Sequence, residues 1–154
     1  MERVIDAVID TLRNGGLKGV TLFWGDPMMY SSFDLPCVAV GPNTDTVEPR
    51  TTHKDVVTYD LYLWVVVSAR DRDMTASNES PSSREAIRLV DGHYDEQGNL
   101  LTPGVRTILR GDITLGGRVK ELVMSRTDYR NGILTNEAVR VARTSLTVKQ
   151  FITR

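Results

Sequence analysis

The segment from Val56 to Ser68 constrains the fold of this chain more than any other part of the sequence. Its odd-numbered positions from Val57 to Val67 are all apolar, whereas its even-numbered positions mix polar, apolar and aromatic side chains. Because successive side chains of a strand point to opposite faces of a sheet, this pattern predicts one long β-strand whose odd face packs under helices. The even face, with Tyr62 and Trp64, has two interpretations: it is covered only partly or by another subunit, or it is buried within a monomer.

Helices are predicted on both sides of this strand in the sequence. Residues 2–13 repeat apolar side chains at helical spacing, with charged residues mostly on the opposite side. After the strand, the polar segment 69–81 is expected to be an exposed, mobile loop. A second helix is predicted to follow it, because Ser82 and Glu85 have the spacing of a capping box. A short third helix is predicted over residues 103–110.

Further strands are predicted where apolar runs lie between residues that favour turns. They are expected at 20–24, 36–40, 118–129 and 137–152. The Gly41-Pro42-Asn43 sequence is expected to end the second of these, and Arg130-Asn131-Gly132 to form the hairpin turn between the last two. The apolar positions of the final strand change parity, which predicts a bulge or sharp bend between Arg143 and Ser145. Residues 94–102 favour a turn or a short hairpin.

The composition excludes several functional classes. The 154 residues include 19 basic and 20 acidic side chains, a formal net charge of -1, so attraction of the whole protein to nucleic acid or an anionic membrane is not expected. The single cysteine, Cys37, excludes an intramolecular disulfide and any multi-cysteine zinc site. The chain opens with no secretory pattern, and its apolar runs are far shorter than the roughly 20 residues that span a bilayer. We expect a soluble protein in a reducing compartment.

The charges are unevenly distributed along the chain. Residues 104–154 hold ten basic and four acidic side chains, whereas residues 1–103 hold nine and sixteen. If the two parts occupy different faces, complementary surfaces could meet between copies, or a basic surface could line a channel for nucleic acid. The alternative, which the alternation of basic and apolar residues favours, is that the charges interleave across paired strands.

Catalytic and metal-binding motifs are sparse. The two histidines and the absence of a nucleophile-elbow pattern give a serine triad no support, and Cys37 lies in an apolar run where burial is the expected role. Asp91, His93 and Asp95 could offer metal ligands, but three polar residues beside a glycine turn are more typical of a surface. We therefore predict no catalytic residue, no metal ligand and no cofactor.

The order of the predicted elements resembles that of a known class of proteins. An N-terminal amphipathic helix is followed by strands with a long central one, a polar loop, a second helix and two long closing strands. With the segment Phe23-Trp24-Gly25-Asp26-Pro27 and the run from Ala138 to Val148, the chain is similar to the tail terminator and tail-completion proteins of long-tailed bacteriophages. The resemblance implies an α+β fold in one domain over residues 1–154, with two main helices on one face of a mostly antiparallel β-sheet.

The same resemblance implies a structural virion protein of the tail or neck, assembled in the host cytoplasm and without catalytic residues. It implies a homo-oligomer, a hexameric ring that caps the tail tube and joins it to the neck or head connector. Its partners would be the tail tube protein and the neck proteins, with genomic DNA passing through the lumen without sequence-specific binding and with no membrane partner. Another head–tail connector or a minor tail protein is the nearest alternative.

The candidate interface residues come from side-chain chemistry, because aromatic, methionine and arginine side chains are favoured in interfaces. They are Tyr62, Trp64, Met28, Met29, Tyr30, Arg70 and Arg72. Two alternatives from other classes stay open. One is a small α+β ligand-binding or metal-dependent enzyme domain that uses Asp91, His93 and Asp95. The other is a nucleic-acid-binding module, which the near-neutral charge disfavours.

Overall fold

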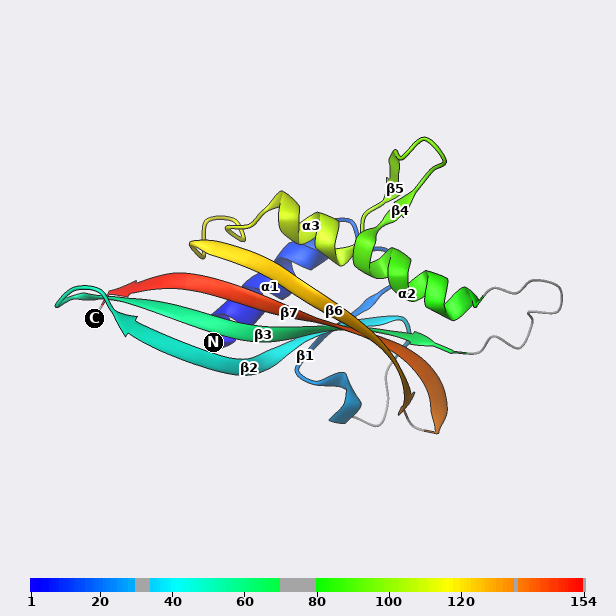
Figure 1. Cartoon of the computed structure of the whole chain (residues 1–154), viewed down its shortest axis with the longest axis horizontal. Coiled ribbons are helices and arrows are strands. Elements are labelled where there is room, and N and C mark those ends of the chain that lie inside the picture. Colours follow the sequence, from blue (N-terminus) through cyan, green and yellow to red (C-terminus); the bar gives the residue numbers. More distant parts are fainter. Residues whose placement is uncertain (30–33, 70–79, 135, 154) are drawn as a thin grey trace.

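The computed structural model describes residues 1–29, 34–69, 80–134 and 136–153. Within these residues, helices lie on one face of a twisted sheet, and the opposite face carries only a short 3-10 turn, η1 (Figure 1). We call the face without α-helices the open face. The helices are α1 (Glu2–Asn14), α2 (Pro81–Asp91) and α3 (Val105–Gly111), and η1 is Pro27–Met29.

The main sheet is almost entirely antiparallel. Its strands, in spatial order, are β1 (Thr21–Trp24), β2 (Cys37–Pro49), β3 (Lys54–Ser68), β7 (Glu137–Thr153) and β6 (Glu121–Leu134). Only β1 and β2 run parallel to each other. A separate hairpin, β4 (His93–Tyr94) and β5 (Leu100–Thr102), projects beyond the helices (Figure 1). The predicted α+β fold with helices on one face of a mostly antiparallel sheet is confirmed, as are the 94–102 hairpin and the third helix.

The main core lies between the helices and the odd-numbered side chains of β3. These side chains, from Val57 to Val67, are all buried, and Ile5, Val8 and Leu12 of α1 are buried against them. An amphipathic helix and a strand with one apolar face pack in this way because each removes the other's apolar surface from water. The sequence prediction for α1 and for the odd face of β3 is confirmed.

The even face of β3 is covered only in part within the described chain. Trp64 and Val66 are buried in a second, smaller cluster with Cys37 and Ala39 of β2 and Leu134 and Val139 at the end of the β6–β7 hairpin. Farther along the strand, Asp60 and Tyr62 stay half-buried. Of the two sequence interpretations, partial coverage is the one that fits.

The parity change in β7 has a different cause from the predicted bulge. The register of β7 with β3 is unbroken from Thr153 to Val139. Val139 packs in the open-face cluster, whereas Ala142, Leu146 and Val148 pack in the main core on the other face. One regular strand therefore contributes to two cores at its two ends. The register shift lies instead in β6, between Met124 and Thr127.

Two strand ends also differ from the sequence prediction. β2 does not end at Gly41 but continues to Pro49 with a register shift between Pro42 and Thr44. Since β1 ends at Trp24, this part of β2 is an edge, where proline is tolerated. Residues 130–132 form no turn either, because β6 runs on to Leu134 and pairs there with Glu137.

Helix α2 begins with a different cap from the one that the spacing predicts. Ser80 is the N-cap, and its hydroxyl accepts a hydrogen bond from the Ser83 amide at 3.3 Å. Pro81 occupies the first turn, where a missing N–H is harmless. Ser82 is buried instead, and its hydroxyl accepts a hydrogen bond from Nε of Arg140. Of the preceding loop, residues 70–79 lie outside the described chain.

Candidate functional site

A hollow on the open face of the sheet gathers several of the predicted interface residues. It has a volume of about 530 Å³ and is lined by Asp26, Met28, Tyr62, Trp64, Arg130 and Arg143, among others. We call it the open-face hollow. It lies beside the smaller hydrophobic cluster, which shares Tyr62 and Trp64 with it. It therefore joins η1, β3 and the β6–β7 hairpin, three segments that are far apart in the sequence.

The floor of the open-face hollow follows from strand geometry. Tyr62 and Trp64 lie two residues apart on β3, so their side chains share one face, with ring centroids 5.6 Å apart. Gly41 faces them from β2, and a Cβ there would lie 3.0 Å from the Trp64 ring. The glycine thus lets the indole pack close to the neighbouring backbone.

One wall of the hollow is set by the turn after β1. The carboxylate of Asp26 accepts a hydrogen bond from the Met28 amide at 2.9 Å, which fixes the start of η1. The Met28 methyl group reaches the β6–β7 hairpin, where it would lie 3.3 Å from a Cβ at Gly132. Met28 is partly exposed at 36%. A flexible thioether in this position gives the hollow an adaptable wall.

The charges of the hollow are carried mainly by arginine. The guanidinium carbon of Arg143 lies 4.6 Å from the centroid of the Tyr62 ring, a cation–π contact. In the sheet register, Arg143 lies between Trp64 on β3 and Asp128 on β6. Arg130 adds a second cation to the lining and Asp26 an anion. The hollow can therefore take a group that combines an apolar body with a polar or anionic end.

The structure brings three of the seven predicted interface residues together. Tyr62, Trp64 and Met28 all line the open-face hollow. Met29 lies in η1, directly after Met28. Tyr30, Arg70 and Arg72 lie outside the described residues.

Sequence reasoning missed the arginines of the hollow. Because Arg143 alternates with apolar residues, the sequence pattern predicts that it lies on a solvated sheet face. Its position beside Trp64 depends on the register between β3 and β7, and Arg143 follows Trp64 by 79 residues in the sequence. The one signal available was parity: Val139, Val141 and Arg143 share a face, and two of the three are apolar.

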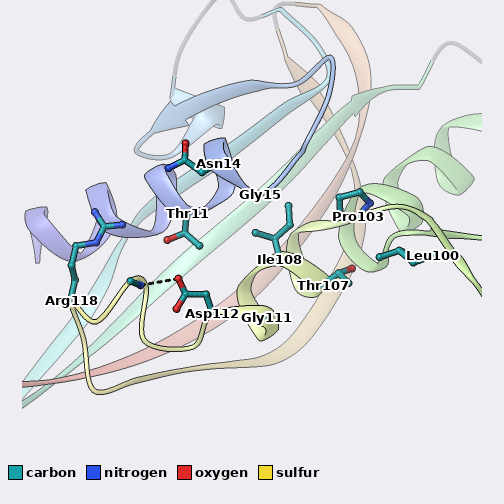
Figure 2. Close-up of a pocket in the computed structure, with 11 residues that line it drawn as sticks. Thr11, Asn14, Gly15, Leu100, Pro103, Thr107, Ile108, Gly111, Asp112 and Arg118 are labelled. Carbon is teal, nitrogen blue, oxygen red and sulfur yellow. Dashed lines mark hydrogen bonds between the residues drawn. The ribbon is translucent and has the colours of Figure 1, made fainter.

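A second hollow, of about 550 Å³, lies on the helix side between the end of α1, α3 and the loop after α3 (Figure 2). Its charged side chains form hydrogen bonds with α1 and with the loop after α3. Arg118 donates to the carboxylate of Asp10 at 3.1 Å and to the carbonyl oxygens of Ala7 and Leu115. Asp112 accepts from the Gly116 amide at 2.8 Å, the dashed line in Figure 2. These bonds hold the loop against α1, which is a structural role.

The structure does not assemble a metal site from Asp91, His93 and Asp95. Asp91 forms an ion pair with Arg106. Asp95 accepts hydrogen bonds from the amides of Gln97 and Asn99 in the β4–β5 turn, and the bonds from Asn99 contribute most to lowering the pKa of its carboxyl group. Among the described residues, no three His, Cys, Asp or Glu side chains are grouped so that they could hold a metal ion.

The two oppositely charged parts of the sequence are interleaved in the fold. Ion pairs join them at Arg118–Asp10, 3.1 Å, and at Arg106–Asp91. The central pairing of β3 with β7 also places a strand of the acidic part beside one of the basic part. The interpretation that the charges alternate across paired strands therefore fits the structure better than two separate charged faces.

The comparisons with protein families and with curated proteins found no match for this chain. In the part of the chain that the structure describes, no helix is long and apolar enough to cross a membrane.

Proposed function

We propose that this chain is a structural subunit of a bacteriophage tail, a tail terminator that forms a hexameric ring, caps the tail tube and joins it to the neck. The observation that carries the proposal is the open-face hollow. Tyrosine, tryptophan, methionine and arginine are the residue types enriched in protein interfaces, and here all four line one hollow on a sheet face without α-helices. In the proposed ring, a neighbouring subunit or the tail tube fills this hollow.

The overall charge of the chain is not expected to hold DNA tightly. With a net charge of -1 and with ion pairs linking its acidic and basic parts, the chain has no strong field to hold a polyanion. DNA passing through the lumen would therefore not be retained. Another head–tail connector or a minor tail protein would use the same surface, and the end of the tube that the protein occupies distinguishes these roles from a terminator.

The experiment is co-sedimentation of the purified protein with tail tubes that lack a terminator, followed by electron microscopy of the tube ends. We expect a saturable amount of protein per tube and a ring at one end. The variants Tyr62→Ala and Arg143→Glu should lose this binding, because they remove the floor and the charge of the hollow. Thr58→Ala, a half-buried position on the open side of the same strand, is the matched control and should bind normally. A protein that stays monomeric and ignores the tubes contradicts the proposal.

A second candidate function is the binding of a small anionic ligand in the same hollow. Its volume of about 530 Å³ is in the range of ligand pockets, about 300–1,000 Å³, and Arg130 and Arg143 both line it. Here Arg143→Glu should abolish binding of small aromatic carboxylates or phosphates in calorimetry. Failure of such compounds to bind, together with normal binding of tubes, selects the structural role.

A further inference from the structure

Strand β6 offers an edge to which another strand can be added. It is 14 residues long, contains no proline and, among the described residues, pairs with β7 alone at the margin of the sheet. Its outer backbone N–H and C=O groups therefore face away from the sheet. The open part of β2, Gly41–Pro49, differs because Pro42 and Pro49 remove donors from it. Of the two long edges, β6 is the one suited to pairing.

Apolar side chains lie along this edge. Tyr129 is 48% exposed and Ile133 73% exposed, and both lie on the helix side of the sheet, since they pair with Ala142 and Ala138 of β7. Ile87 of α2, 47% exposed, lines with Tyr129 a groove of about 280 Å³ between α2 and β6. Exposed apolar surface beside an unpaired strand is a typical feature of a pairing surface.

The charges on β6 specify the partner. Asp128 and Arg130 lie on either side of Tyr129 and share the open face of the sheet. If two copies of β6 pair in antiparallel orientation with Tyr129 opposite Tyr129, Asp128 of each copy lies opposite Arg130 of the other. Opposite charges directly across a strand pair stabilise it. The sequence from 128 to 130 is thus complementary to itself.

Most other registers lack this complementarity. The register centred on Thr127 pairs Arg126 with Asp128, but Arg126 lies between Met124 and Thr127, where β6 shifts its register with β7. A pair centred on Asp128 places two aspartates together, and one centred on Arg130 places two arginines together, both of which are unfavourable. A pair centred on Asn131 brings Tyr129 opposite Ile133 but pairs no charges. Registers centred between two residues, for example between Asp128 and Tyr129, would place side chains from opposite faces of the sheet across from each other.

We infer that two copies of this chain pair through β6, antiparallel and related by a two-fold axis at Tyr129, so that one sheet continues through both. The pairing covers the β6 edge and part of the apolar side chains beside it. It goes beyond the proposed function, because a two-fold contact between copies in solution differs from the head-to-tail contact that joins the subunits of a closed ring, and its failure would leave the ring proposal untouched.

The first test is a charge exchange followed by analytical ultracentrifugation. The wild-type chain should dimerise with rising concentration. Asp128→Arg and Arg130→Asp alone should each raise the dissociation constant at least about tenfold, because each places like charges opposite one another. The double variant D128R/R130D restores both pairs and should return the dissociation constant to within a few fold of the wild type. Within one copy, Asp128→Arg removes the ion pair with Arg126 and places an arginine opposite Arg143 of β7, so the single and double variants are compared at concentrations and temperatures at which all of them are folded.

Matched controls keep this test specific. Glu48→Arg and Arg50→Asp make the same charge changes at exposed positions of the β2–β3 hairpin, towards the edge of the sheet opposite β6. These variants should leave dimerisation unchanged. Unfolding midpoints confirm that every variant folds. A wild-type chain that is monomeric at all concentrations, or a double variant as weak as the single ones, overturns the inference.

The second test determines the register. In the inferred pair, a cysteine at Tyr129 has its Cβ about 5 Å from its counterpart, whereas cysteines at Asn131 are separated by about 13 Å. A short bifunctional thiol reagent should therefore cross-link Tyr129→Cys dimers and not Asn131→Cys dimers, and the native Cys37 is buried and does not interfere. Cross-linking through Asn131 alone, or through neither site, contradicts the Tyr129-centred pair.

Discussion

The guanidinium group of Arg143 lies over the ring of Tyr62, 4.6 Å from its centroid, on the open face of the sheet. The two residues come from β7 and β3, and Tyr62 also contacts Trp64, whose ring centroid is 5.6 Å away. A cation and two aromatic rings are thus held together by strand register alone. This arrangement gives the chain an interface-like surface on its open side.

The contact between Arg143 and Tyr62 should be measurable as a coupling in stability. We predict that a double-mutant cycle with Arg143→Met and Tyr62→Leu gives a coupling of about 0.5–1 kcal/mol in urea unfolding, the usual range for a partly exposed cation–π pair. A cycle between Arg143→Met and Thr58→Ala, whose side chains lie farther apart, is the control and should be additive. Additivity in both cycles contradicts a stabilising contact.

The buried hydroxyl of Thr144 should contribute to stability although it lies in the apolar core. Its Oγ1 lies 2.6 Å from that of Thr127, which also accepts a hydrogen bond from Arg106 at 2.9 Å. Thr144→Val keeps the shape but leaves the Thr127 hydroxyl without this partner, so we predict a loss of about 1–2 kcal/mol. Thr58→Val, on the open face, should change stability by less than about 0.5 kcal/mol. Equal effects of the two would argue against the hydroxyl pair.

Two glycines of the α3 region should respond in opposite ways to alanine. At Gly104, just before α3, a Cβ would lie 2.3 Å from the Gly92 amide nitrogen and 2.7 Å from the Val90 carbonyl oxygen, so Gly104→Ala must displace backbone. We predict a loss of about 1–3 kcal/mol or more. At Gly111, the last residue of α3, a Cβ meets nothing within 4 Å, and Gly111→Ala should be neutral or stabilise by up to about 1 kcal/mol. Thermal and urea unfolding of both variants provide the comparison.

Cys37 makes the stability of the fold dependent on alkaline pH. Burial raises the pKa of its thiol from 9.0 to about 11. Between pH 9 and pH 11 the unfolded chain releases the thiol proton, whereas the folded chain keeps it. The folded state is therefore not penalised below pH 9 and loses stability relative to the unfolded chain as the pH rises towards 11. The free energy of unfolding should therefore fall by up to about 1.4 kcal/mol per pH unit more in the wild type than in Cys37→Ala. Parallel pH curves of the two proteins would contradict this.

The local patterns of the sequence predict the elements well, and the partners of those elements poorly. The helical spacing of α1 and the alternation in β3 each depend on one segment, and both predictions are confirmed. The continuation of β2 past Gly41 depends on where β1 ends, and the parity change of β7 depends on a second core on the open face. Such features come from strand register, which no single segment encodes.

The candidate site also contains some residues that the sequence indicates and others that only the pairing of distant strands brings together. Aromatic residues on the even face of β3 could be recognised from the sequence, because Tyr62 and Trp64 are unusual on a half-polar strand face. Arg130 and Arg143 could not be assigned to the same hollow before β6, β7 and β3 were placed side by side. Likewise, Asp128 and Arg130 become complementary only once β6 is known to be an edge.

The most direct measurement of the proposed structural role is electron microscopy of tail tubes incubated with the purified protein. The proposal predicts a hexameric ring at one end of each tube with the wild-type protein and with Thr58→Ala, and bare tube ends with Arg143→Glu. Bare ends with the wild-type protein, or rings that form equally well with Arg143→Glu, would contradict an assembly role for the open-face hollow.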